Sequence, residues 1–181
     1  MKAFFFIAII LMPEKAFPRT PTINERVVDI AGIFVGVMEQ GVNRHPFIDE
    51  WNRRLGVPLG SSYCATFISF ILDSARATAP HVRSGVAQRF ITQSSVRAER
   101  VMSGQVTIPA GSIVIWRRGD TWMGHVGITE RQWTGSRGYT IEGNTSPGTT
   151  GSQSNGNGIW RRTRTINPTA YFRITNFTHV H

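Results

Sequence analysis

The spacing of apolar residues predicts helices in the first half of the chain. A capping box, "TINE" at residues 22–25, precedes apolar residues at helical spacing that continue towards Gly41. "HPFIDEWNRRLG" predicts a short second helix from Pro46 to Gly56, because proline suits the first helical position and glycine suits the C-terminal end. Two helices are therefore expected before residue 57.

A third helix is expected after the break "VPLGSS", with Ser61 or Ser62 as its cap. Its first turn contains Cys64, the only cysteine of the chain. Its expected buried face consists of Phe67, Ile68, Ile71, Leu72 and Ala75. A weaker helical pattern covers residues 85–92.

After residue 103 the pattern changes to short β-branched and aromatic runs separated by glycine. These runs predict a meandering antiparallel sheet: "SIVIW", "HVGIT", "YTIEG", "GIWRRTRTI" and "YFRIT". A Gly/Ser/Thr/Asn-rich segment, residues 143–158, is expected to form a mobile loop between two strands. Helices followed by strands indicate an α+β fold, with N-terminal helices packed on a C-terminal antiparallel β-sheet.

The first residues have a different pattern, because a basic start is followed by an unbroken apolar run from Ala3 to Met12. These are the proportions of a secretory signal, whereas a membrane span needs about twenty apolar residues. We expect residues 1–16 to be a signal peptide and residues 17–181 to be a single domain, secreted or periplasmic and without a membrane span. An uncleaved tether and a first core helix are the alternatives.

The full chain has a net charge of +9, and both of its lysines lie before residue 17, so about +8 remains after residue 16 with arginine as the only basic residue apart from histidine. Such a chain is attracted to anionic partners, which include cell-wall polymers, acidic lipids and nucleic acid. The arginine pairs are scattered and lack an aromatic platform motif, which argues against nucleic acid. Hydrophobic residues at 40% and charged residues at 17% exclude a chain kept unfolded by self-repulsion.

Cys64 is either an inert core thiol or a nucleophile. Backbone N–H groups and the helix dipole stabilise a thiolate at a helix N-terminus, but a lone buried cysteine is more often inert. Possible partners lie downstream, where His125 begins one expected strand and Glu142 and Asn144 end the next. A hairpin brings these strand ends together, and residues two apart on a strand share a face. The set predicts a nucleophile, a base and an orienting group.

In the segments that contain Cys64, His125, Glu142 and Asn144, the chain resembles the CHAP amidase/peptidase family. This family is related to the NlpC/P60 cell-wall hydrolases within the papain-like fold. The resemblance covers roughly residues 26–175 and is strongest around Cys64, around His125 and at "EGN". It implies that Cys64 is the nucleophile, His125 the general base and acid, Glu142 the residue that orients His125, and Asn144 a fourth polar member. It also implies a bacterial catalytic domain that cleaves an amide bond of peptidoglycan, between sugar and stem peptide or within the peptide.

Tyr63 departs from the family, since many relatives carry Gln or Trp before the cysteine. Tyr63 and Trp122 are expected to contact substrate or the oxyanion, with the backbone N–H of Cys64 as the safer oxyanion donor.

Cleavage of an amide through a thioester intermediate on Cys64 requires no cofactor and no metal, and a monomer is sufficient for it. The same three groups could also catalyse acyl transfer or thioester hydrolysis. The alternative outside the enzymes is a catalytically silent, arginine-rich protein of the same fold that binds the cell wall or another surface.

Overall fold

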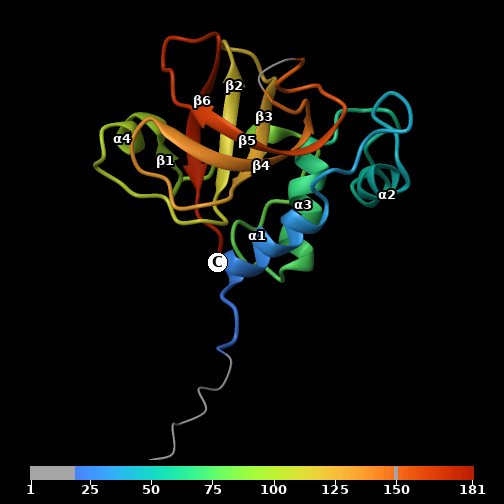
Figure 1. Ribbon diagram of the computed structural model, residues 1–181, viewed down its shortest axis with the longest axis horizontal. Coiled ribbons are helices and arrows are strands. Elements are labelled where there is room, and N and C mark those ends of the chain that lie inside the picture. Colours follow the sequence, from blue (N-terminus) through green and yellow to red (C-terminus); the bar gives the residue numbers. More distant parts are fainter. Residues whose placement is uncertain (1–18, 149–150) are drawn as a thin grey trace, which may run out of the picture.

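In the computed structural model, which describes residues 19–148 and 151–181, all helices except α4 precede a six-stranded antiparallel sheet (Figure 1). The helices are α1 (Ile23–Ile33), α2 (Pro46–Arg54), α3 (Cys64–Ser74), the 3-10 helix η1 (Ala87–Phe90) and α4 (Ala98–Met102). The strands are β1 (Val96–Arg97), β2 (Ile113–Arg118), β3 (Gly124–Thr129), β4 (Arg137–Thr145), β5 (Gly158–Thr165) and β6 (Phe172–Thr178). The predicted α+β class is confirmed. The expected signal peptide lies outside the described residues.

The first two helices begin where their capping residues predict. Thr22 and Glu25 form the capping box of α1, and the His45 side chain accepts a hydrogen bond from the Phe47 N–H at the start of α2. The expectation that the first helix runs towards Gly41 is wrong, because α1 ends at Ile33 and Gly36 follows with a φ of 92°. A residue in this left-handed region cannot continue a right-handed helix.

Helix α3 begins at Cys64, but neither Ser61 nor Ser62 caps it. Its N-cap residue is Tyr63, whose side chain makes no capping hydrogen bond. The first turn is held instead by Thr66, whose hydroxyl donates to Asn52 Oδ1 at 2.7 Å and to the Tyr63 carbonyl at 3.2 Å. The predicted buried face of this helix is confirmed, since all five of its residues are fully buried.

The order of strands in the sheet is β1-β6-β2-β3-β4-β5. The predicted meander is therefore correct for β2 to β5 and wrong for the last strand, which returns to pair with β2. Four consecutive residues of β2, 113 to 116, are buried, and pairing with both β3 and β6 satisfies the backbone of this central strand. Two short elements, β1 with two residues and α4 with five, were not predicted from the sequence.

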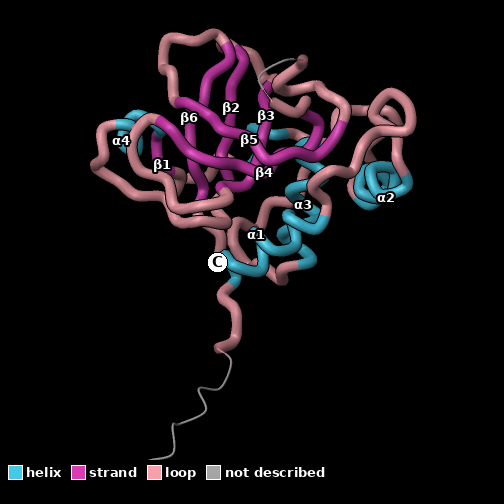
Figure 2. The backbone as a smooth tube through the Cα atoms, viewed as in Figure 1, coloured by secondary structure: helices cyan, strands magenta, loops and turns pink. Residues whose placement is uncertain are grey.

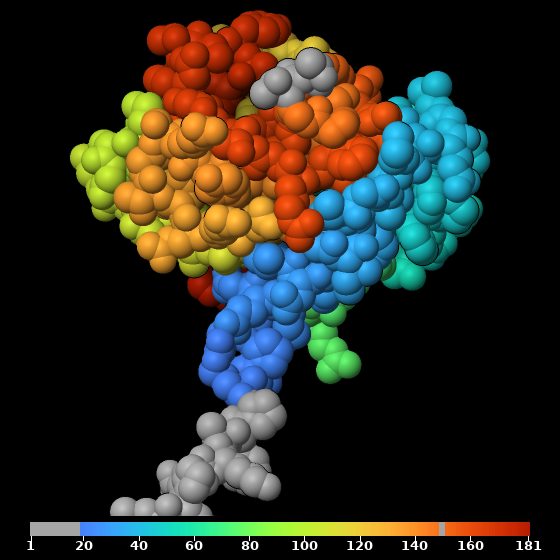
Figure 3. Space-filling model, viewed as in Figure 1, coloured from blue at the N-terminus to red at the C-terminus, as the bar shows by residue number. Residues whose placement is uncertain are grey.

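Residues of β2 alternate between two hydrophobic clusters. Ile113 and Ile115 pack in the cluster formed with α1, α2 and α3, whereas Val114 and Trp116 pack in a second cluster with α4. The strands form one body, with α1 to α3 at one side and α4 at another (Figure 2). In the space-filling view the N-terminal helices pack directly along the C-terminal strands (Figure 3). This packing brings the start of α3 to the sheet.

Candidate active site

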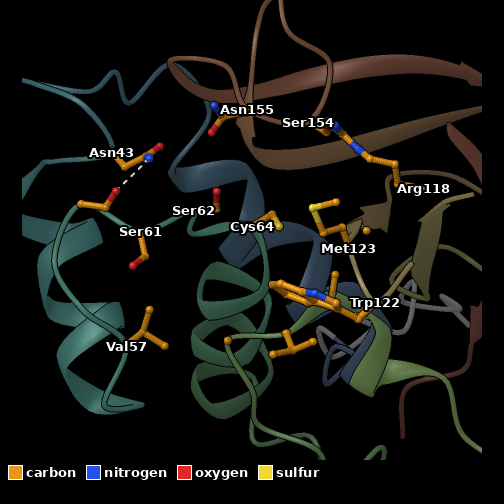
Figure 4. Close-up of a pocket in the computed structure, with 15 residues that line it drawn as sticks. Asn43, Val57, Ser61, Ser62, Cys64, Arg118, Trp122, Met123, Ser154 and Asn155 are labelled. Carbon is orange, nitrogen blue, oxygen red and sulfur yellow. Dashed lines mark hydrogen bonds between the residues drawn. The ribbon is translucent and has the colours of Figure 1, made fainter. Parts of the chain in front are cut away.

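Cys64 lies at the wall of a pocket of about 610 Å³ (Figure 4). The residue is 6% exposed, so most of its surface is packed while its sulfur remains at the edge of the pocket. Because Cys64 is the first residue of α3, its N–H belongs to the first turn, whose N–H groups have no partner within the helix. Donors for a developing negative charge are thus next to the sulfur.

His125 and Glu142 are joined by a hydrogen bond between neighbouring strands. His125 Nε2 lies 2.9 Å from Glu142 Oε2, and both side chains are fully buried. Strands β3 and β4 are paired through Ile128 and Ile141, and this pairing places His125 and Glu142 near the same end of the sheet. The carboxylate therefore determines the orientation of the imidazole ring.

Arg164 of β5 binds the same carboxylate and was missed by the sequence analysis. Its Nε donates to Glu142 Oε1 at 2.7 Å, and its Nη2 donates to Oε2. The Thr140 hydroxyl donates to Oε1 as well, and the Arg164 guanidinium lies 5.5 Å from the ring of Trp116. The stretch "RRTR" follows "YTIEG" in the next expected strand, and its second and fourth residues are arginines that share one face of that strand. This spacing was the signal that could have revealed Arg164.

The charges of this cluster shift two pKa values in opposite directions. Burial of His125 disfavours its protonation, but hydrogen bonding and charge from Cys64 and Glu142 outweigh burial and raise its pKa to about 9. Burial of Glu142 favours its neutral form, but Arg164 and His125 outweigh burial and lower its pKa to about 2. The arrangement favours a protonated imidazole beside an ionised carboxylate at neutral pH.

The second nitrogen of His125 is the one available to Cys64. Nε2 is occupied by Glu142, while Nδ1 is buried and has no hydrogen-bond partner among the described residues. Interactions with Cys64 are among the causes of the raised pKa of His125, and Nδ1 is the ring nitrogen that Glu142 leaves for them. The unpartnered Nδ1 is therefore the atom suited to exchange a proton with Sγ.

Asn144 is fully buried and contacts the start of α3. With its amide oriented to satisfy its neighbours, Oδ1 accepts from Ser62 Oγ at 3.2 Å and from the Tyr63 N–H at 3.3 Å, and Nδ2 donates to the Gly156 carbonyl at 3.1 Å. The sequence argument that Glu142 and Asn144 share a strand face does not apply, because Asn144 has a φ of 58° and the register shifts after Glu142. Asn144 therefore supports the segment before Cys64.

Tyr63, for which a contact with substrate or the oxyanion was expected, is fully buried, and its side chain is not among those that line the pocket. Its hydroxyl donates to Glu39 Oε1 at 3.2 Å. Burial and the charge of Glu39 raise the pKa of the Tyr63 hydroxyl, which stays protonated. Trp122 is 73% exposed and lines the pocket, as a substrate-contacting residue would.

The described part of the Gly/Ser/Thr/Asn-rich segment is hydrogen-bonded to the site. Ser154 and Asn155 line the pocket, and the Gly156 N–H donates to the Asn144 carbonyl at 3.1 Å. Gln153 accepts hydrogen bonds from Arg164, through its side chain at 3.0 Å and its carbonyl at 2.9 Å. The segment is thus connected to the arginine that binds Glu142.

Within residues 19–148 and 151–181, no group of three or more His, Cys, Asp or Glu side chains is arranged to hold a metal ion. No helix in the same ranges is both long enough and apolar enough to cross a membrane.

Comparison with known proteins gives one match. A family model described as CHAP domain matches residues 56–144, which include α3, β2, β3 and β4 up to Asn144. No curated protein and no solved structure matches the chain. The CHAP domain indicates a hydrolase of the amidase or peptidase type that acts on peptidoglycan. The helices and six-stranded sheet agree with the α+β, papain-like fold of this family. Residues 56–144 thus match the CHAP-domain family, the family that the sequence resembles.

Proposed function

We propose that this protein is an exported cysteine hydrolase that cleaves an amide bond of peptidoglycan through a thioester on Cys64. The bond is either the one between N-acetylmuramic acid and the stem peptide or one within the peptide. Residues 1–16 supply the export signal, so the enzyme acts outside the cytoplasm, in the wall or the periplasm.

The proposed reaction begins with a thiolate on Cys64 and a proton on His125. The thiolate attacks the amide carbonyl carbon, and first-turn N–H groups of α3, that of Cys64 first, hold the oxygen as it becomes negative. Collapse of the tetrahedral intermediate breaks the C–N bond, and the leaving amine takes the proton from Nδ1 of His125. His125 then accepts a proton from water, which attacks the thioester and releases the acid and Cys64.

The observation that carries the proposal is the buried His125–Glu142–Arg164 cluster beside Cys64. A histidine that is fully buried, bonded to a fully buried carboxylate and open at its other nitrogen is costly to maintain as a purely structural feature. Each of its neighbours has a function in the proposed reaction: Glu142 orients the ring, and Arg164 keeps Glu142 ionised.

Digestion of defined muropeptides with mass analysis of the products tests the activity and identifies the bond. The purified protein is expected to release fragments that differ by one hydrolysed amide. Cys64→Ala is expected to abolish this release while it leaves the circular dichroism spectrum and the unfolding midpoint close to those of the wild type. Retained hydrolysis in Cys64→Ala would refute the cysteine mechanism. Binding to walls without hydrolysis by the wild type would favour the silent, surface-binding alternative.

A further inference from the structure

The pocket beside Cys64 is lined by fifteen residues, of which one carries a charged side chain, Arg118. The remaining lining groups are glycine, hydroxyl, amide and apolar groups, with Trp122 and Met123 among the last. No carboxylate is present among these lining residues. The pocket therefore has a single positive group and nothing within its walls that neutralises it.

Arg118 is held in position by weak partners only. It ends β2, its Nη2 donates to Ser154 Oγ at 3.2 Å, and its guanidinium lies 5.7 Å from the ring of Phe172. Among the described residues it forms no ion pair with an acidic side chain, in contrast to Arg164. Most guanidinium donors of Arg118 are thus free to bind a ligand.

The preceding arginine provides a contrast. Arg117 lies outside the lining of this pocket, and its Nε donates to Gln88 Oε1 at 3.0 Å. Successive residues of a strand point to opposite sides, so the two arginines do not share a function. Only Arg118 is available to a substrate that reaches Cys64.

The pocket has two chemically different sides. In Figure 4, Cys64 lies between Asn43 and Ser61 on one side and Met123, Trp122 and Arg118 on the other. A guanidinium without an acidic partner recognises a carboxylate through two parallel N–H···O bonds, and it gains little from a neutral carboxamide. A substrate that places a carboxylate on the Met123 side would therefore orient its amide carbonyl over the sulfur.

We infer that Arg118 is a specificity residue that binds a free peptide carboxylate next to the scissile amide. The inference rests on the proposed function, because the ligand is taken to be a stem peptide of peptidoglycan. The enzyme then prefers stem peptides in which the acidic residue has a free side-chain or main-chain carboxylate over stem peptides in which this carboxylate is converted to a carboxamide.

Two soluble muropeptides that differ only in this group, carboxylate or carboxamide, provide the test. Their affinities are measured by titration calorimetry on the Cys64→Ala protein, so that the result does not depend on turnover. The carboxylate form is expected to bind about tenfold more tightly, as one charge-assisted hydrogen-bonded pair predicts. Adding Arg118→Gln is expected to remove the difference by weakening the carboxylate form alone, and Arg118→Lys is expected to retain part of it.

Two further variants separate recognition from loop support. Arg117→Gln is the matched control and is expected to keep the tenfold preference. Ser154→Ala removes the hydrogen bond to Arg118 and is also expected to keep the preference; if it reproduces Arg118→Gln, Arg118 acts through the loop and the inference is wrong. Equal or absent binding of the two muropeptides to the Cys64→Ala protein likewise overturns it. The proposed function is judged separately, by hydrolysis of either muropeptide by the wild type.

Discussion

His125 in water would be mostly neutral at pH 7, but its interactions with Cys64 and Glu142 change its titration in this protein. Its raised pKa, about 9, means that the stabilisation from its protonated form is complete below the unfolded value near 6.5 and is lost as the pH rises through 9. Glu142 behaves oppositely, since its lowered pKa gives stabilisation that is present above about 4.5 and is lost as the pH falls towards 2. The two groups together therefore stabilise the folded protein most between about pH 4.5 and about pH 6.5.

The first prediction concerns the alkaline limit of activity. If protonated His125 gives its proton to the leaving amine, kcat/KM should fall as the pH rises through about 9. Glu142→Gln removes a negative charge that raises this pKa, so the alkaline limit should move to lower pH and kcat should fall by about 10²- to 10⁴-fold. A pH–rate profile, together with an NMR titration of His125, measures both effects.

Glu130→Gln is the control for this substitution, because Glu130 also pairs with an arginine of β5, Arg161, whereas the carboxylate bonded to His125 is that of Glu142. It should leave the profile unchanged. An alkaline limit that stays in place in Glu142→Gln would contradict the assigned coupling between Glu142 and His125.

The second prediction concerns stability. Arg164→Met removes one of the two cationic partners of a fully buried carboxylate, and breaking a buried ion pair costs up to about 3–5 kcal/mol, with His125 as the remaining partner of Glu142. Arg161 lies on the same strand as Arg164 and pairs with Glu130, but its side chain is half-exposed. Arg161→Met should therefore lower the free energy of unfolding by less than about 1 kcal/mol. Urea unfolding at pH 7 gives both values, and similar losses in the two variants would show that the Glu142–Arg164 pair has no special weight.

At the scale of elements, the site depends on close approach between strands β2, β3 and β4. A Cβ atom on Gly124 would lie 2.3 Å from the Trp116 carbonyl oxygen, and one on Gly127 would lie 2.7 Å from Glu142 Cγ. The glycines on either side of His125 thus leave room for a neighbouring backbone and for the carboxylate that orients the ring.

The third prediction follows from this contact. Gly127→Ala should displace Glu142 and reduce both stability, by about 1–3 kcal/mol, and kcat. Gly32→Ala is the matched control: its Cβ would make only an ordinary contact, 3.6 Å from Arg161, and alanine in α1 should stabilise the helix by up to about 1 kcal/mol. Thermal unfolding and a hydrolysis assay report on both; full activity in Gly127→Ala would show that Glu142 tolerates displacement.

At the scale of the whole molecule, the excess of basic residues, most of them arginine, gives the full chain a net charge of +9. Part of this charge has local functions, as Arg164 and Arg118 illustrate, and the remainder produces a positive field that attracts anionic polymers. Attraction of this kind acts over a distance that salt shortens.

The fourth prediction separates this field from the chemistry of the pocket. Binding of the protein to purified cell walls, measured by co-sedimentation, should weaken steeply between about 0.1 M and 1 M salt, since the Debye length falls from about 10 Å to about 3 Å. Hydrolysis of a small uncharged muropeptide should change little over the same range. Equal salt dependence of the two would mean that the surface charge has no separate function in wall association.

Most helices and strands could be predicted because their signals are local. The capping box before α1, the proline and glycine around α2 and the apolar face of α3 are short-range patterns, and the structure follows them. The end of α1 and the cap of α3 were wrong, because a left-handed Gly36 and a buried contact between Thr66 and Asn52 replaced the expected signals.

The amino-acid sequence by itself determined the order of α1 to α3 and β2 to β6, the position of Cys64 in a first turn, and the candidate partners His125, Glu142 and Asn144. These follow from periodicity and spacing over a few residues, and their catalytic roles stay predictions until the variants are measured. Only the tertiary structure decided that β6 pairs with β2, that Tyr63 is buried, that Asn144 supports the segment before Cys64, and that Arg164 binds Glu142. Each of these depends on contacts between elements distant in the chain, which no local pattern specifies.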